Sequence, residues 1–104
     1  MSNRSVILVL FDLPSKTKEE QKSYIIFRKN LKKNGYIQLQ ESIYVKLLRN
    51  SSTIKSELLY LDKIAPEVGS VLALPLTLNE FSKTVAIRDS DFDFNLFSND
   101  ILYL

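Results

Sequence analysis

The hydrophobic and polar positions along the chain predict strands and helices in alternation. Residues 6–13 are almost continuously apolar and rich in strand-forming residues, as expected for a central strand covered on both faces. Thr17 and Glu20 have the spacing of a capping box, and Gly35 can end the helix that they open. The apolar stripe of this helix consists of Tyr24, Phe27 and Leu31.

The rest of the chain continues this alternation. Two short strands are predicted over residues 36–40 and 42–48, followed by a second helix that Asn50 and Ser51 can cap. The apolar stripe of the second helix consists of Ile54, Leu58, Leu61 and Ala65. Pro66 and Gly69 are expected to end this helix. Strands over residues 70–78 and 85–88 complete the series. The order βαββαβ with one more strand predicts an α+β sandwich of the ferredoxin-like type, with both helices on one face of the sheet.

Two helices on one face leave the other face of such a sheet uncovered, although the predicted strands are apolar on both faces. In the strand over residues 70–78, Val71 and Ala73 alternate with four leucines, and the first strand has no polar alternation. Large uncovered apolar faces are rare in soluble monomers. We therefore predict a homodimer in which a second copy covers this face. Pro75 cannot donate a ladder hydrogen bond, so its strand is expected at an edge or a bulge.

The chain has 104 residues, enough for one domain, and its composition excludes several kinds of chemistry. It contains no cysteine and no histidine, so thiolate or imidazole catalysis and metal sites built from these residues are excluded. Carboxylates, hydroxyls, lysines or a hard cation such as Mg²⁺ remain for any reaction. The first apolar run is too short to cross a membrane and has no cleavage site, so we expect a cytoplasmic protein that binds no membrane.

The net charge of +2 is distributed unevenly along the chain. Residues 1–88, the expected domain, hold all 14 basic residues and eight acidic ones, whereas residues 89–104 form a tail with four aspartates and no basic residue. At 100° per residue, four lysines of the first helix fall within about 60° of one another; they are Lys18, Lys22, Lys29 and Lys33. This face is suited to phosphate groups, and it also has the composition of an ordinary solvated helix surface.

Asp12 is the one charged residue in the first predicted strand. An isolated buried carboxylate is costly, and it persists by pairing or by binding a metal. One structural role would be a hydrogen bond to the backbone amide of Lys16 or Thr17. If a two-fold axis passes nearby, two copies of Asp12 repel each other unless they share a proton or a cation, and Mg²⁺ suits such a pair.

Several motifs, in the same order along the chain, resemble those of one known family. Residues 9–14, a strand ending in Asp12, resemble the opening signature of the smaller of the two universal CRISPR spacer-acquisition proteins. Three further motifs are similar to those of this family: Tyr24-x-x-Phe27-Arg28-Lys29-x-Leu31-x-x-x-Gly35-Tyr36, Gln40-x-Ser42-Ile43-Tyr44 and Leu76-Thr77-Leu78-Asn79-Glu80-Phe81. The resemblance covers residues 6–88.

The resemblance implies that Asp12 is a catalytic, metal-binding residue that each protomer contributes to a site on the dimer axis. It implies Mg²⁺-dependent nuclease activity on RNA or double-stranded DNA, and a role in bridging two dimers of the CRISPR integrase around the spacer-precursor DNA. Arg28 and Lys29 match basic positions of the first helix in this family, and together with the other lysines of that helix face they are candidates for nucleic-acid binding. Phe92 and Phe94 are candidates for docking the tail on the integrase by strand addition, or for folding it back as an extra edge strand.

Two classes of function therefore compete, a scaffold that positions DNA and the integrase, and a nuclease that uses a metal at Asp12. One carboxylate per chain is a sparse ligand set for an efficient enzyme, which favours the scaffold as the main role. A VapD-like toxin ribonuclease shares the expected architecture and is the enzyme alternative outside CRISPR. A non-catalytic RNA-recognition module is disfavoured, because the region of residues 36–39 lacks the paired aromatic side chains that it would use.

Overall fold

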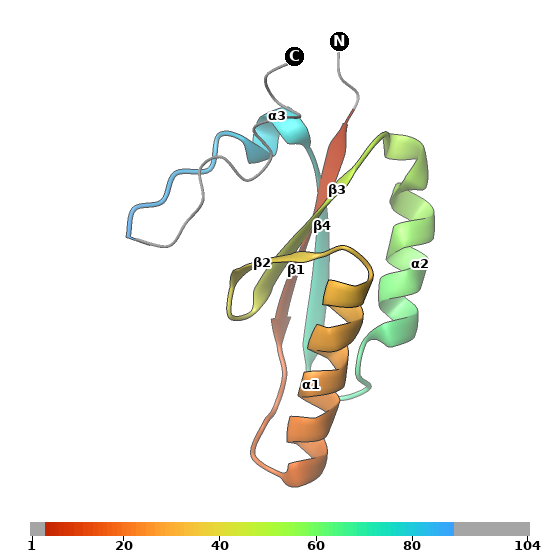
Figure 1. Cartoon of the computed structure of the whole chain (residues 1–104), viewed down its shortest axis with the longest axis vertical. Helices are drawn as coiled ribbons and strands as arrows, with labels where there is room; N and C mark the ends of the chain where they lie inside the picture. The colour runs from red at the N-terminus through yellow and green to blue at the C-terminus, as the bar shows by residue number, and fades with distance from the viewer. Residues whose placement is uncertain (1–3, 89–104) are drawn as a thin grey trace.

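The computed structural model describes residues 4–88, which form an antiparallel sheet with two helices packed on one face (Figure 1). In chain order the elements are β1 (Ser5–Asp12), α1 (Lys18–Lys33), β2 (Ile37–Gln40), β3 (Ile43–Leu48), the 3₁₀ turn η1 (Ser51–Thr53), α2 (Ile54–Ile64), β4 (Ser70–Thr77) and α3 (Leu78–Phe81). The four strands lie in the order β2-β3-β1-β4. The predicted βαββαβ order is confirmed, and the arrangement is compatible with a ferredoxin-like fold.

The first helix begins and ends where local sequence signals place it. Thr17 Oγ1 accepts a hydrogen bond from the Glu20 N–H, and Glu20 Oε1 accepts one from the Thr17 N–H, at 3.0 Å each. This reciprocal capping box satisfies donors that have no partner within the helix. At the other end Gly35 has a φ of 91°, a conformation that glycine adopts at little cost.

The main core lies between the sheet and the two helices. Successive strand residues point to opposite faces, and Ile7, Val9 and Phe11 of β1 point toward the helices, where each is buried. Phe27 and Leu31 of α1 are buried against them, as the apolar stripe predicted. The Phe11 and Phe27 rings meet edge to face with centroids 5.1 Å apart, a favourable aromatic geometry.

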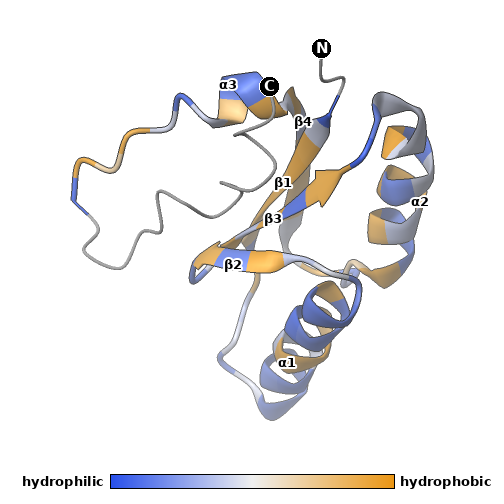
Figure 2. Cartoon of the chain, turned by 45° about the horizontal axis from the view of Figure 1, so that its top comes forward, coloured by the Kyte–Doolittle hydropathy of each residue, from blue (hydrophilic) through white to orange (hydrophobic). Residues whose placement is uncertain are grey.

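The opposite face of the sheet is also apolar, and it is open along its β4 side. Val6, Leu8 and Leu10 of β1 lie on it, and their ladder partners in β3 and β4 are all aliphatic, namely Leu47, Val45, Ile43, Leu76, Leu74 and Leu72. Figure 2 shows the hydrophobic colour running along β1. Val6 and Val45 on this face are buried in a cluster with Leu78 and Phe81 of α3, whereas Leu72 is 63% exposed and Leu74 is 47% exposed. The described part of the chain thus leaves the β4 side of this apolar face uncovered.

The prediction of a fifth strand over residues 85–88 is wrong. A second capping box, from Thr77 to Glu80, turns the chain out of the sheet into α3, so Leu78 begins a helix instead of ending a strand. Residues 85–88 form no strand, and Val85 and Ile87 are 70% and 79% exposed. A strand needs a neighbour for its backbone hydrogen bonds, and none lies beside this segment among residues 4–88. By contrast β4, which contains Pro75, is an edge strand as predicted.

A polar cluster joins the helix layer to the sheet around one carboxylate oxygen. Glu57 Oε1 in α2 accepts hydrogen bonds from Asn34 Nδ2, Tyr36 Oη and Lys46 Nζ, each at 3.0 Å. The side chains of Glu57 and Lys46 are 12% and 23% exposed. Burial, together with the nearby Glu57 carboxylate, raises the pKa of Tyr36 well above its ordinary value of 10.0. The cluster therefore holds a neutral tyrosine beside an ion pair.

This arrangement predicts a loss of stability in alkali. A group whose pKa is raised by folding contributes stability that is fully present below its unfolded pKa and is lost as pH rises through its folded pKa. The free energy of unfolding should therefore decline above about pH 10, with Tyr36 contributing at most about 1.4 kcal/mol per pH unit. Tyr36→Phe should lower stability at pH 7 by about 1 kcal/mol and flatten the alkaline decline, as measured by urea unfolding.

Tyr60→Phe is the matched control. The Tyr60 hydroxyl donates a longer bond, 3.4 Å, to the Asn30 carbonyl, and Tyr60 is the smallest of the causes that raise the pKa of Tyr36. Removal of the Tyr60 hydroxyl should therefore flatten the alkaline decline far less than Tyr36→Phe does. An equally steep decline in Tyr36→Phe would show that Tyr36 is not the group that titrates.

Candidate functional site

Asp12 is the last residue of β1, at one end of the sheet face that the helices leave open. Its side chain is on the same face as those of Leu8 and Leu10, because residues two apart in a strand point the same way. Ser70 of β4 lies directly opposite Asp12 in the ladder. The candidate site is thus a carboxylate at the margin of an apolar sheet surface.

The structure corrects two expectations about Asp12. Its side chain is exposed, not buried, because β1 ends at this residue and α1 and α2 pack on the other face. The backbone N–H groups of Lys16 and Thr17, which were its candidate partners, donate instead to Glu20 Oε1 at 3.0 Å each. Neither a buried position nor a capping role in α1 therefore accounts for this carboxylate.

Gly69 fixes the backbone around Asp12 from the loop between α2 and β4. Its φ is +106°, and a Cβ added there would lie 2.9 Å from the Asp12 carbonyl oxygen and 2.8 Å from Leu13 Cδ2. Any larger residue would push the loop away from the end of β1. The sequence predicts Gly69 only as a helix-stop signal, and no local pattern indicates this positioning role.

Residues 4–88 of one chain do not provide a complete metal site at Asp12. Among residues 4–88, no group of three or more side chains of the metal-binding types lies close together. Mg²⁺ can be held by one or two carboxylates, since it keeps several waters, but one exposed carboxylate alone is a weak ligand set. The residues of one copy thus fit Mg²⁺ only if another carboxylate joins Asp12.

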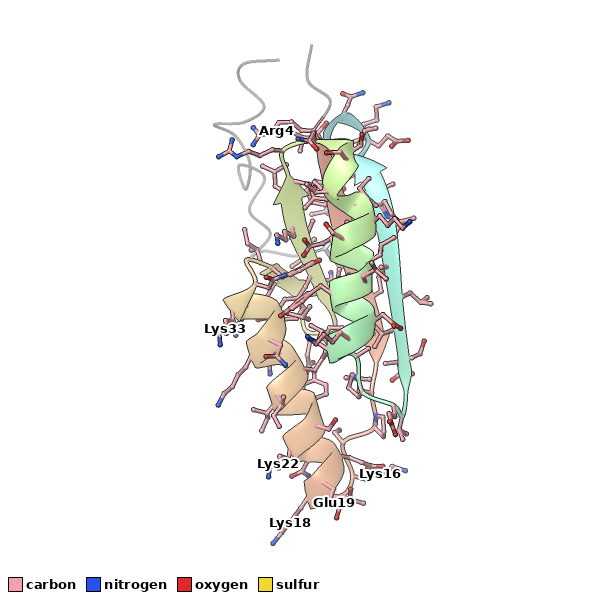
Figure 3. All side chains as sticks on the ribbon, turned by 90° about the vertical axis from the view of Figure 1, so that its right-hand side faces the viewer. Arg4, Lys16, Lys18, Glu19, Lys22 and Lys33 are labelled. Carbon is pink, nitrogen blue, oxygen red and sulfur yellow. The ribbon has the colours of Figure 1, made fainter. Side chains whose placement is uncertain are left out.

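The four predicted lysines of α1 share an exposed surface. Lys18, Lys22, Lys29 and Lys33 are all exposed. In Figure 3, Lys22 and Lys33 extend from α1 on the side away from α2, and Lys18 lies at the tip of the helix. The stripe of Tyr24, Phe27 and Leu31 occupies the buried side, so the lysine face is available to solvent and to a partner.

Arg28 differs from these lysines because its guanidinium turns toward the sheet. Its Nε donates to the Tyr44 hydroxyl at 3.0 Å, and its Cζ lies 5.6 Å from the centroid of the Tyr24 ring. The hydrogen bond to Tyr44 raises the pKa of Arg28 above its ordinary value, so the guanidinium stays charged. Tyr44 itself is fully buried. Arg28 thus helps to pack α1 on β3, and its Nη groups are the donors left for a phosphate.

Three more residues belong to the exposed side of α1. Lys32 is exposed and falls about 40° from Lys18 on the helical wheel, a position that periodicity alone could have identified. Ile25 and Ile26 are 50% and 48% exposed among the lysines. The face is therefore basic, with Ile25 among the lysines and Ile26 at its margin.

Phe92 and Phe94 lie outside the residues that the structure describes, as does the whole acidic tail over residues 89–104. Within residues 4–88, no helix combines the length and apolar character that crossing a bilayer requires.

The fold and these surfaces define a small α+β protein with a basic helix, an open apolar sheet face and one carboxylate at its margin. The family model described as CRISPR associated protein Cas2 matches residues 5–84. The chain belongs to the Cas2 family, which confirms the resemblance inferred from its motifs.

Proteins named CRISPR-associated endoribonuclease Cas2 are similar to this chain in several bacteria. The chain is 43% identical over 77 residues to the one from Campylobacter jejuni, a segment that covers 74% of this chain and 54% of that relative. It is 34% identical over 82 residues to one from Streptococcus mutans, covering 79% and 77% of the two chains. It is 38% identical over 77 residues to one from Treponema denticola, covering 74% and 76%. The chain thus spans about half of the first relative and about three quarters of the other two.

Proposed function

We propose that this protein is a CRISPR adaptation subunit that dimerises, holds spacer-precursor DNA and bridges dimers of the integrase. The observation that carries this proposal is the open apolar face of the sheet in a chain of the Cas2 family. Family membership supports a CRISPR-associated role, and it favours this role over that of a VapD-like toxin. The uncovered face supports assembly with a second copy as the first step.

The proposed dimer covers the face formed by β1, β3 and β4. Leu72 and Leu74 are too exposed and too close together to be explained as isolated surface residues, since Leu10 and Leu8 lie directly beside them in β1. Isologous packing of two such faces would bury these leucines in both copies. Asp12 lies on the same face, so the same packing would bring two Asp12 residues toward each other if the axis passes near the end of β1.

Binding of duplex DNA is proposed for the lysine face of α1. Residues 4–88 contain all 14 basic residues of the chain, and a dimer would present two lysine faces. Lys18, Lys22, Lys29 and Lys33 would contact phosphates, with Arg28 contributing through its Nη groups. Contacts of this kind hold the DNA without reading its sequence, which suits a protein that must accept any spacer precursor.

Nuclease activity is proposed as a second function. The relatives are named endoribonucleases, and the substrate here would be RNA or double-stranded DNA. Asp12 from two copies would hold Mg²⁺, which when bound activates water for attack on a phosphodiester. The ligand set of one carboxylate per copy is sparse, so we assign the scaffold as the main role.

Integrase binding tests the proposal. We propose that Phe92 and Phe94 dock on the integrase by adding a strand to one of its sheets, with the phenyl rings in pockets. Truncation after Arg88 should then abolish integrase binding in calorimetry and leave the melting temperature unchanged. Phe92→Ser with Phe94→Ser should act in the same way, whereas Ile101→Ser with Leu104→Ser should retain binding.

Two other outcomes count against this assignment. A marked fall in dimer stability on truncation would mean that the tail belongs to the fold. Failure of the intact chain to bind the integrase would contradict the bridging role itself.

A further inference from the structure

A cavity of about 330 Å³ lies beside the first turns of α1, where the β1–α1 loop meets the α2–β4 loop. This volume is at the lower end of the range for small binding sites in proteins. Its apolar lining includes Leu13, Tyr24 and Val68, and its acidic lining includes Glu19 and Glu67. Nothing in the proposed function uses these residues.

The walls of this cavity are held in place by the fold. Gly69, with its φ of +106°, lets the α2–β4 loop approach so closely that an added Cβ would lie 2.8 Å from Leu13 Cδ2. Tyr24 packs against the core with its ring centroid 6.0 Å from that of Phe11. Val68 nevertheless is 64% exposed. An exposed valine beside anchored apolar side chains indicates a surface with room for another apolar group.

The charge of the cavity opposes a nucleic acid. No lysine or arginine is among its lining residues, and its carboxylates would repel phosphates. The start of α1 offers little to an anion, because the Lys16 and Thr17 N–H groups donate to Glu20 Oε1 and the Glu20 N–H donates to Thr17 Oγ1. Lys18 and Lys22 extend from the helix on another side than Glu19 (Figure 3).

We propose that this cavity is a protein-docking site for a segment that presents one apolar side chain directly beside a lysine or arginine. The apolar side chain enters between Leu13, Tyr24 and Val68, and the cation pairs with Glu19 or Glu67. Charge complementarity selects this occupant, because an acidic segment would meet three carboxylates and a neutral one would offer them no counter-ion. The site is separate from the lysine face of α1, so a protein segment and DNA can be bound together.

Three peptides of equal length test this inference on the intact, isotope-labelled chain. The probe is Ser-Gly-Arg-Leu-Arg-Gly-Ser, and its two controls replace the leucine by serine or both arginines by glutamate. In amide NMR spectra the probe should shift signals confined to residues 13–24 and 66–69, and both controls should bind at least about tenfold more weakly.

Charge reversal in the protein gives the second arm of the test. Glu67→Lys should weaken binding of the arginine peptide by at least about tenfold and should strengthen binding of the glutamate peptide. Glu41→Lys, an equal change of an exposed acidic residue outside the cavity lining, should bind the probe as the wild type does. The proposal is overturned if the probe shifts none of these signals or if all three peptides bind alike. It is also overturned if duplex DNA shifts the signals of residues 66–69, which lie outside the lysine face, because the cavity would then be part of the nucleic-acid surface.

Discussion

Replacing Asp12 with asparagine should abolish Mg²⁺-dependent cleavage of RNA or duplex DNA while leaving dimerisation and DNA binding close to wild type. Asparagine keeps the size of the side chain but removes the charge that would hold the cation, and a dimer loses both carboxylates at once. Because Asp12 is exposed at the end of β1, the substitution should cost little stability. Cleavage of labelled substrates with and without a chelator is the measurement.

Asp62→Asn is the matched control, since Asp62 is an exposed carboxylate on α2. It should cleave as the wild type does. If Asp12→Asn also cleaves at the wild-type rate, the activity belongs to other residues or to a contaminant, and the role assigned to Asp12 is incorrect.

Affinity for duplex DNA should fall about a thousandfold between 50 and 200 mM salt. This follows if the two lysine faces of a dimer neutralise about six phosphates, which gives a slope of about −5 for log K against log salt concentration. Binding should not depend on the DNA sequence, because phosphate contacts carry no base information. Fluorescence anisotropy with two unrelated duplexes over a salt series is the measurement.

Charge reversal separates the lysine face from the overall charge. Lys22→Glu with Lys29→Glu should weaken binding and flatten the slope, whereas Lys55→Glu with Lys63→Glu makes the same change in net charge on the exposed side of α2 and should do neither. Equal losses in both variants would assign the binding to net charge alone. A wild-type slope shallower than about −2, or a strong sequence preference, would contradict the phosphate-tracking surface.

Local signals in the sequence predicted most of the elements. The Thr17 to Glu20 spacing and Gly35 marked the two ends of α1 because the capping box and the positive φ involve only neighbouring residues. The apolar stripe of Phe27 and Leu31 likewise identified the buried side of the helix. Such features do not depend on what lies elsewhere in the chain.

Features that depend on distant partners could not be predicted in this way. Asp12 looked buried because it ends an apolar strand, yet its exposure is decided by which sheet face the helices cover. Residues 85–88 have strand-like composition, but a strand also needs a neighbouring edge. Arg28 was grouped with the lysines, and its contact with Tyr44 depends on how α1 packs on β3.

The polar cluster around Glu57 likewise could not be predicted from local sequence signals. Its four members come from α2, β3 and the segment between α1 and β2, and no sequence spacing links Asn34, Tyr36 and Lys46 to this carboxylate. The nuclease site is the extreme case, since the proposed second carboxylate would come from another copy of the chain.

The central claim is that a second copy covers the open face of the sheet, and the solution mass of the intact chain tests it most directly. Sedimentation equilibrium of the wild type should give twice the chain mass of 12.0 kDa. The Leu74→Lys variant should be a folded monomer, because the dimer contact would bury the charge of the lysine. Leu59→Lys is the matched control, since Leu59 is 63% exposed on α2, and it should remain a dimer. A wild-type mass of 12.0 kDa at all concentrations, or a Leu74→Lys variant that still dimerises, would contradict the account.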